Sequence, residues 1–480
     1  MKNSPVLYKN LRNYAKTDFY PFHMPGHKRR MQWAGASSFP NPYEIDITEI
    51  EGFDNLHHPE GIIKESMDWA ASLYGAHKTY YLINGSSSGI LSAVSGTVPD
   101  SGTILISRNC HKSVYHGIYL KSLKSEYIYP QYSEEYGIQC GLDPEEIELM
   151  LKKNRDISAV LMVSPTYDGI VSDVKAVSEI CHKNHIPLIV DEAHGAHFRY
   201  GDIFPVPALE SGADVVIQSV HKTLPCFTQS ALLHLREGYI DTEKIERYLQ
   251  IYQSSSPSYV LMAGIERGLL WMEQEEGREK MKEFSASLRK LRQDLKNMRN
   301  LKIPGREIVG TKNIFDLDIS KIIISVKGTD ITGPRLAERL RNEYHLEMEM
   351  WTEDYVTAIT TVMDTKEGLN RLREGLLTID RELKPSEIPE SVYPRSWKSR
   401  PAVTIHEAWN RSSEQVPLRQ SRGRISAEFL YLYPPGIPLI APGELITEEI
   451  IETVMRYKEE RLPVQGLKDR TTETISVLSP

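Results

Sequence analysis

The chain has 480 residues, of which 40% are hydrophobic, and its 57 basic and 65 acidic residues give a formal net charge of −8. This length predicts two to three domains with a sizeable core. No strongly basic segment is present, so nucleic acid is a poor candidate partner. The four cysteines are widely spaced and form no CxxC pair, which predicts neither a zinc ribbon nor a disulfide framework and fits a reducing compartment.

The N-terminal stretch 1–16 is polar and lacks the apolar core of a secretory signal. No apolar run approaches the roughly 20 residues that a membrane-spanning helix needs. We therefore expect a cytoplasmic protein without a membrane partner.

Short runs rich in Val, Ile and Leu alternate with a helical pattern (174–185) through the middle third of the chain. The runs predict strands at 102–107, 159–165, 186–195 and 213–222. Continuous apolar strands separated by helices are typical of a parallel sheet that is buried on both faces. We predict an α/β fold whose large domain contains a mainly parallel sheet.

The last part of the chain predicts a second, smaller α/β unit. Residues 262–300 show a long helical pattern with many charged residues, which we interpret as a connecting helix. The strands and helices predicted beyond it are 321–328, 333–344, 355–364 and 367–383.

A connector rich in Pro and Ser (384–403) precedes a tail motif (433–444) whose four prolines exclude a regular helix or a central strand. We predict an N-terminal segment (1–60), a large cofactor-binding domain (61–300) and a small C-terminal domain (301–480).

Polar residues follow several of the predicted strands. Ser219, His221 and Lys222 follow one apolar run and Asp191 ends another, and open α/β sheets bind ligands beyond the carboxyl ends of their strands. A lysine among apolar neighbours has a lowered pKa and can form a Schiff base with an aldehyde. A carboxylate that faces a pyridine nitrogen keeps it protonated, so that the ring accepts electrons. Taken singly, each of these residues is more often a strand or helix cap.

The segment 84–89, "NGSSSG", joins a predicted strand to a predicted helix and offers backbone N–H groups and hydroxyls to a phosphate. The chain contains no Gly-Lys dipeptide and no GxGxxG, so neither a Walker A loop nor a dinucleotide site is predicted. His111 follows the strand 102–107, where its imidazole could stack on a flat ring. Together these features favour a phosphorylated aldehyde cofactor over four unrelated caps.

The motifs that contain these residues resemble those of the prokaryotic ornithine/lysine/arginine decarboxylase family, which are fold-type-I pyridoxal-phosphate enzymes. The resemblance covers most of the chain, and its most specific motifs are "SVHK" (219–222) and "GRISAE…YPPGIPLIAPGE" (423–444). The other motifs are "PFHMPGHK" (21–28), "LHHPEGIIKE" (56–65), "NGSSSG" (84–89), "RNCHKS" (108–113), "SPTYDG" (164–169) and "DEAHGAH" (191–197).

The resemblance implies a large domain like that of aspartate aminotransferase and pyridoxal 5'-phosphate as cofactor. It implies decarboxylation of a basic L-amino acid (arginine, lysine or ornithine) to an amine and CO₂, with a role in polyamine metabolism. Lys222 would form the Schiff base and Asp191 would pair with the pyridine nitrogen. His221 would lie near the Schiff base, where it or Lys222 would deliver a proton.

Six further residues would line the cofactor by the same resemblance: His111, Ala193 and His194 at the ring, and Ser86, Ser87 and Ser219 at the phosphate. Ser255 stands where the family usually has a threonine that reaches the phosphate of the neighbouring subunit. The chain resembles the compact members without the N-terminal wing domain of larger relatives. We therefore expect a homodimer, or a higher homo-oligomer, with shared active sites.

A basic substrate needs a carboxylate for its distal cation, because an unpaired buried charge is costly. The acidic stretch 44–54 could supply it, with Glu49 as the first candidate, although charge runs are more often solvated.

Several alternatives stay open or are disfavoured on the sequence. Another fold-type-I enzyme, such as an aminotransferase, shares the same residues, and a Cys-dependent lyase lacks an obvious nucleophile. A non-enzymatic relative would be expected to have lost Lys222 or Asp191. The "DEAH" at 191–194 lacks the other features of a helicase, and the paired histidines lack the ligand spacing of a zinc site.

Overall fold

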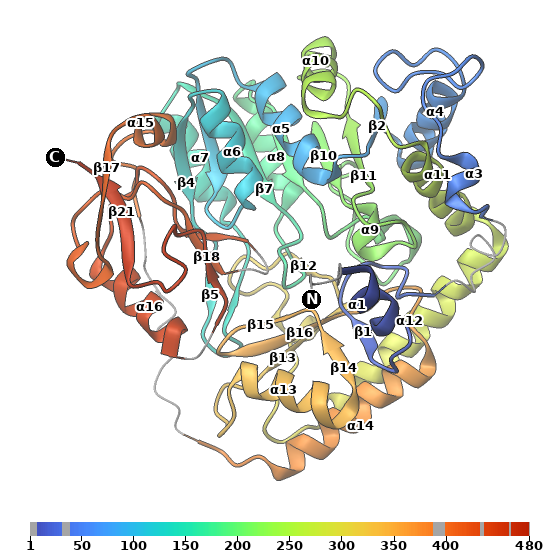
Figure 1. Cartoon of the computed structure of the whole chain (residues 1–480), viewed down its shortest axis with the longest axis vertical. Helices are drawn as coiled ribbons and strands as arrows, with labels where there is room; N and C mark the ends of the chain where they lie inside the picture. The colour runs from blue at the N-terminus through green and yellow to red at the C-terminus, as the bar shows by residue number, and fades with distance from the viewer. Residues whose placement is uncertain (1–6, 31–38, 387–398, 433–435, 460–461, 480) are drawn as a thin grey trace, which may run out of the picture.

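The centre of the fold is a seven-stranded sheet (Figure 1). A computed structural model describes residues 7–30, 39–386, 399–432, 436–459 and 462–479. In spatial order the strands are β2 (Lys78–Leu82), β11 (Ala231–Leu235), β10 (Val215–Gln218), β9 (Leu188–Asp191), β7 (Ile157–Val163), β3 (Thr103–Ser107) and β4 (Lys124–Ile128). All neighbouring pairs from β10 to β4 are parallel, whereas β11 runs antiparallel to both of its neighbours.

Helices cover both faces of this sheet, which explains why its central strands are continuously apolar. Alternate residues of one strand enter different cores: Val216 packs with one set of helices, and Val215 and Ile217 pack with the other. One face is covered by α5 (Gly85–Thr97), α6 (Lys112–Leu120) and α10 (Thr242–Tyr252), and the other by α7 (Pro144–Lys153) and α8 (Val174–Lys183). The predicted α/β class with a mainly parallel sheet is confirmed.

The predicted connecting helix is two helices, α11 (Tyr259–Glu273) and α12 (Glu275–Leu295). The chain is extended at Gln274, with φ −74° and ψ 161°. At this corner a Cβ on Gly277 would lie 2.1 Å from the carbonyl oxygen of Trp271, so only glycine allows the approach. The helical pattern of the sequence contains no signal for this break other than the glycine.

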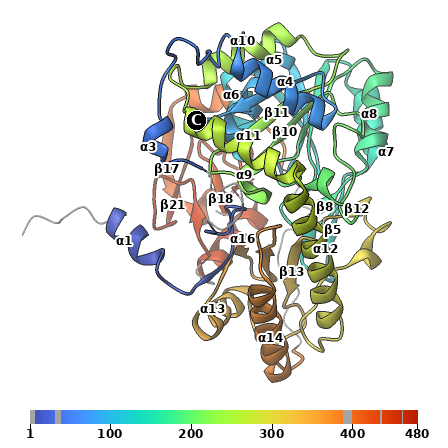
Figure 2. The same ribbon diagram turned by 90° about the vertical axis from the view of Figure 1, so that its right-hand side faces the viewer.

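A small antiparallel sheet lies beside α12, opposite the large sheet in Figure 1. Its strands are β13 (Lys321–Ser325), β16 (Tyr355–Ile359) and β15 (Met350–Trp351), and its helices are α13 (Gly333–Tyr344) and α14 (Lys366–Glu382). Figure 2 shows α12 descending toward α14, and these two helices pack together. The small sheet and these helices share one apolar core with α4 (Ile62–Tyr74) and α11.

The C-terminal part of the chain has an apolar core of its own. Its elements are α15 (Ile405–Asn410), β17 (Ser413–Pro417), β18 (Leu430–Leu432), β19 (Pro438–Ile440), α16 (Glu448–Glu459), β20 (Val464–Gln465) and β21 (Thr474–Leu478). The proline-rich tail motif contributes β19, which lies at the edge of a three-stranded sheet, as expected for a strand with a proline. The rest of that motif at 433–435 and most of the predicted connector, 387–398, lie outside the described residues.

The remaining elements are short. They are α1 (Leu7–Tyr14), β1 (Tyr20–Phe22), α3 (Pro42–Ile45), β5 (Tyr132–Ser133), β6 (Ile138–Gln139), β8 (Ile170–Val171), α9 (Val220–Thr223), β12 (Asp316–Leu317), β14 (Leu346–Met348) and three single 3-10 turns. Across the ranges that the structure describes, no helix is both long and apolar enough to cross a bilayer. The boundaries 1–60, 61–300 and 301–480 remain a prediction.

Candidate active site

Lys222 lies in α9, the single helical turn that follows the carboxyl end of β10. Its ammonium nitrogen Nζ is 3.0 Å from Nε2 of His194. Burial lowers the pKa of Lys222 to about 8, and the cation of Lys321 adds to this effect, whereas the carboxylates of Asp191 and Glu349 oppose it. A lysine with this pKa is partly neutral near physiological pH, which is the form that attacks an aldehyde.

Asp191 is the last residue of β9, which is hydrogen-bonded to β10. The side chain is buried, and Oδ1 accepts a hydrogen bond of 3.1 Å from the backbone N–H of Ala193. Burial raises the pKa of Asp191, and the charge of Lys222 lowers it. The parallel register therefore brings the predicted carboxylate and the predicted lysine to one edge of the sheet.

His111 caps the N-terminus of α6, just after β3. Nδ1 accepts the backbone N–H of Ser113 and lies 2.8 Å from its Oγ. Burial lowers the pKa of His111 to about 3, and Lys222 contributes to the shift. The ring is therefore neutral, and it lies close enough to Lys222 for the lysine's charge to disfavour its protonated form.

The strand end that carries His111 is tied to the C-terminal part of the chain by Arg108. Its guanidinium forms a buried ion pair of 3.0 Å with Glu444 and donates hydrogen bonds to the carbonyl oxygens of Pro438 and Leu439. The tail motif thus holds the β3–α6 turn, a role that the sequence did not reveal. The pairing partner lies 336 residues away along the chain.

The predicted phosphate site is the start of α5. Ser86 and Ser87 lie in its first turn, partly buried and exposed respectively. A Cβ on Gly89 would lie 3.2 Å from Cγ2 of Ile217, so this turn packs directly against the end of β10. Ser219 follows β10, and its buried hydroxyl Oγ has no hydrogen-bond partner.

These observations fit pyridoxal 5'-phosphate. A buried hydroxyl without a partner is unusual in a folded protein, and free N–H groups at a helix N-terminus favour an anion. Ser219 and the first turn of α5 would hold the phosphate, Lys222 the aldehyde carbon, and Asp191 the ring nitrogen. His111 and Ala193 are placed on the turns that follow the neighbouring strands.

His194 and His221 flank Lys222 in different ways. The Nδ1 atom of His194 is buried without a hydrogen-bond partner, and its ring packs edge-on against Tyr167 at 4.7 Å. Nδ1 of His221 lies 2.8 Å from the carbonyl oxygen of Ser230, and burial lowers its pKa to about 4. Both imidazoles are neutral at physiological pH, so in each ring one nitrogen carries a hydrogen and the other can accept a proton.

Ser255 is exposed in the loop between α10 and α11. The adjacent Ser254 donates its backbone N–H to Oδ1 of Asn84, at the start of α5 in the same chain, over 3.3 Å. The loop therefore lies beside the predicted phosphate site. Its action across a subunit interface remains a prediction.

Two groups of the small domain reach the site, and no pattern in the sequence pointed to them. Glu349 lies between β14 and β15, where it accepts hydrogen bonds from the backbone N–H of Met24 (2.8 Å) and from the hydroxyl of Tyr167. Lys321 opens β13; its ammonium is fully buried, 3.9 Å from Asp318, without a hydrogen bond. The charges of both act on Lys222.

Glu49, the first candidate for the distal cation, lies elsewhere. It is partly buried, its Oε1 has no hydrogen-bond partner, and its charge contributes to raising the pKa of Tyr259. It is not among the charges that shift the pKa of Lys222. In the described parts of the chain, no three His, Cys, Asp or Glu side chains gather as a metal ion would require.

Comparisons with known proteins agree with this geometry. The family model described as "Orn/Lys/Arg decarboxylase, major domain" matches residues 5–330, and the model of the corresponding C-terminal domain matches residues 391–459. The arginine decarboxylase of Bacillus subtilis (strain 168) is 33% identical to this chain, over 98% of this chain and 97% of its own length. The inducible lysine decarboxylase of Escherichia coli (strain K12) is 24% identical, over 93% of this chain and 75% of its own.

Solved structures show the same fold. The constitutive lysine decarboxylase of E. coli superposes with a TM-score of 0.76 at 20% identity, covering 99% of this chain and 82% of its own. A ureidoglycine-glyoxylate aminotransferase from B. subtilis superposes with a TM-score of 0.58 over 76% of this chain and 94% of its own. The predicted fold-type-I architecture is confirmed.

Proposed function

Because the chain belongs to the Orn/Lys/Arg decarboxylase family, we propose that it removes the α-carboxyl group of a basic L-amino acid as CO₂. Membership of the family makes the protein an amino-acid decarboxylase with pyridoxal 5'-phosphate as its cofactor. The observation that carries the proposal is the pair formed by Lys222 and Asp191 at adjacent strand ends, where burial lowers the pKa of the amine and raises that of the carboxyl group.

When bound, the cofactor would supply an electron-accepting ring for the electron pair left behind when CO₂ departs. Lys222 would anchor its aldehyde and Asp191 would keep its ring nitrogen protonated. Ser219 and the first turn of α5 would bind the phosphate, and His111 would lie against the ring. His221 or Lys222 would deliver the proton that replaces the carboxyl group at the α-carbon, and His194, whose Nε2 is hydrogen-bonded to Nζ of Lys222, would flank the ring.

A basic substrate is supported by the carboxylate of Glu349. Its charge acts on Lys222 and also on the buried cations of Lys28 and Lys321. Among the described residues, its hydrogen-bond donors are neutral, a backbone N–H and a phenol. A carboxylate bound this way gains from a cation that enters the site with the substrate. The relatives named arginine and lysine decarboxylases act on substrates of this class.

The direct test is CO₂ and amine release from arginine, lysine and ornithine by the purified holoenzyme. Lys222→Ala should abolish turnover and remove the visible absorbance of the bound cofactor, because no amine remains to anchor it. The matched control is Lys282→Ala, an exposed lysine on α12, which should change neither. Normal absorbance and activity in Lys222→Ala, or product formation that requires a keto acid and releases no CO₂, would contradict the proposal; the second result would indicate an aminotransferase.

We also propose a cytoplasmic homodimer, or a higher homo-oligomer, whose active sites are shared through the Ser255 loop and whose product enters polyamine metabolism. Light scattering gives the mass in solution. A mixture of Lys222→Ala with a variant lacking residues 254–256 should regain part of the activity if the loop acts in the other subunit, and should stay inactive if it acts in its own.

A further inference from the structure

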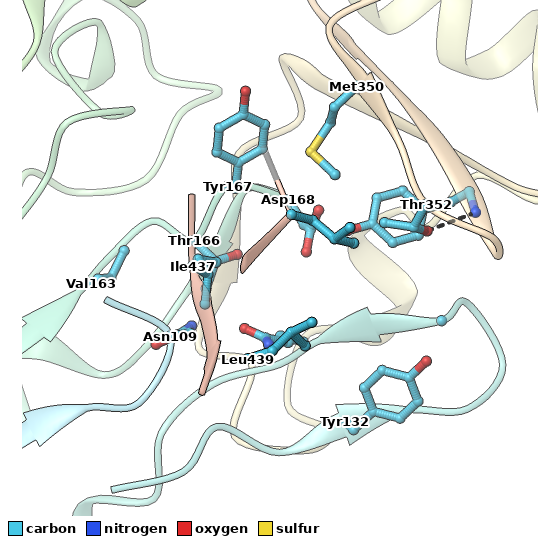
Figure 3. A pocket seen from close by; sticks show the side chains of 14 residues that line it. Asn109, Tyr132, Val163, Thr166, Tyr167, Asp168, Met350, Thr352, Ile437 and Leu439 are labelled. Carbon is cyan, nitrogen blue, oxygen red and sulfur yellow. Dashed lines mark hydrogen bonds between the residues drawn. The ribbon is translucent and has the colours of Figure 1, made fainter. Parts of the chain in front are cut away.

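A small, partly open cavity lies where the large sheet, the small sheet and the C-terminal part meet (Figure 3). Its volume is about 50 Å³, which is room for one small ion and a few waters. The turn after β7 provides Thr166, Tyr167 and Asp168, the turn after β3 provides Asn109, and β16 provides Tyr355.

Asp168 is the charged residue of this cavity. Figure 3 shows its carboxylate near the centre of the lining side chains. The residue is 5% exposed, and its Oδ1 has no hydrogen-bond partner. Oδ1 of Asn109, which is also 5% exposed, has none either. Two buried acceptor oxygens without a donor line one cavity, and because such atoms are rarely left unsatisfied, the cavity favours a bound partner that these oxygens can hold.

The described part of the cavity wall does not supply a positive charge. No Lys, Arg or His is among the side chains that the structure describes in the cavity wall. Burial raises the pKa of Asp168 to about 6, and the one opposing effect is a hydrogen bond with Tyr355. Above that pH the carboxylate is ionised, and a buried charge of this kind needs a counter-ion.

We propose that this cavity binds a monovalent inorganic cation between Asp168 and Asn109. The oxygen atoms of Asp168 and Asn109 are hard ligands, which suit an alkali ion. The single carboxylate provides one negative charge, whereas Ca²⁺ and Mg²⁺ sites generally use several carboxylates or substrate phosphates. The charged end of the substrate is a less suitable ligand, because Asp168 is not among the charges that act on Lys222, whereas Glu349 is.

The ion would affect the active site through the shared wall. The Tyr167 ring lies in that wall, contacts His194 at 4.7 Å and donates its hydroxyl to Glu349. The Asn109 backbone is two residues from His111. A cation that orders these two turns would stabilise the fold and hold His194 and His111 in place.

The test is thermal unfolding of the holoenzyme in tetramethylammonium buffer, titrated with KCl or NaCl at constant ionic strength. The wild type should show a saturable, ion-specific rise in Tm of about 3 °C at a hundredfold excess over Kd. Asp168→Asn should abolish the rise. The control Asp156→Asn, an exposed aspartate before the other end of β7, should retain it.

Asn109→Ala keeps the carboxylate and removes one ligand, so it should weaken the apparent ion affinity severalfold. This variant tests the ion site if Asp168→Asn does not fold. The stabilisation should fade as the pH falls below about 6, because protonated Asp168 binds no cation. The other titratable groups around Asp168 are Cys140, whose pKa is raised by burial to about 12, and the phenols of Tyr132, Tyr167 and Tyr355 in the cavity wall.

A wild type without any ion-specific rise, or an Asp168→Asn variant that keeps it, would overturn the proposal. A third result would also overturn it: the wild type does not respond to alkali ions, and Asp168→Asn raises KM for the basic substrate. That result would assign the cavity to the substrate. CO₂ release at saturating KCl tests the proposed function separately, since it does not depend on which ion, if any, the cavity holds.

Discussion

Replacing Glu444 with glutamine should destabilise the protein far more than an ordinary ion-pair mutation. The carboxylate is fully buried, and its partner Arg108 is 5% exposed at 3.0 Å. Removing one charge of a buried pair leaves the other uncompensated, which costs about 3–5 kcal/mol. The backbone oxygens that Arg108 also contacts favour the lower end of that range.

The assay is thermal unfolding of Glu444→Gln and of a matched control, Glu473→Gln. Glu473 is also paired with a cation, Lys458, but the side chains are 68% and 34% exposed, so its loss should cost only about 0–1 kcal/mol. Unfolding entropies near 2.1 cal/mol/K per residue give about 1 kcal/mol/K for 480 residues. Glu444→Gln should therefore lower Tm by about 3–5 °C and the control by about 1 °C or less.

The same variant should bind the cofactor less tightly, because Arg108 fixes the turn that carries His111. Equal shifts in Tm for Glu444→Gln and Glu473→Gln would refute the reasoning, since burial would then make no difference to the strength of the pair.

Two further predictions concern the charges around Lys222. Only the neutral amine reacts with the aldehyde, so cofactor reloading of the apoenzyme should accelerate about tenfold per pH unit up to pH 8 and then level off. Lys321→Met removes a cation that lowers the pKa of Lys222, so it should move this plateau to higher pH. The control Lys366→Met, on α14, should leave the plateau in place. An unmoved plateau in Lys321→Met would show that the buried cation does not influence the pKa of Lys222. Glu349→Gln should raise KM for a basic substrate at least tenfold, and Glu49→Gln should leave it unchanged; the reverse pattern in steady-state kinetics would return the distal cation to Glu49.

Much of the large domain could be predicted because its sheet is parallel and buried. Uninterrupted apolar runs mark its strands, and the polar residue after each run then falls at one edge. For this reason the sequence alone predicts that Asp191, His111 and Lys222 lie together. The helical pattern likewise predicts α13, whose bounds, Gly333–Tyr344, match the predicted 333–344.

The remainder depends on tertiary contacts that leave no local pattern. Glu349 and Lys321 look like ordinary residues of short strands, and only the docking of the small domain brings their charges to Lys222. The division of the connecting helix at Gln274 follows from how closely Gly277 approaches Trp271. Glu444 belongs to the specific tail motif, but nothing near it in the chain indicates that its partner is Arg108.

The one antiparallel strand of the large sheet has a consequence for how this scaffold can change. β11 returns beside β10, with Gln218 opposite Leu232, and Lys222 lies in α9, in the connection between these two strands. Of the charges that act on it, Asp191 comes from the neighbouring strand β9, whereas Glu349 and Lys321 come from outside the large sheet. Substitutions at Glu349 or Lys321 can therefore change the charges around Lys222 without altering the strands of the large sheet.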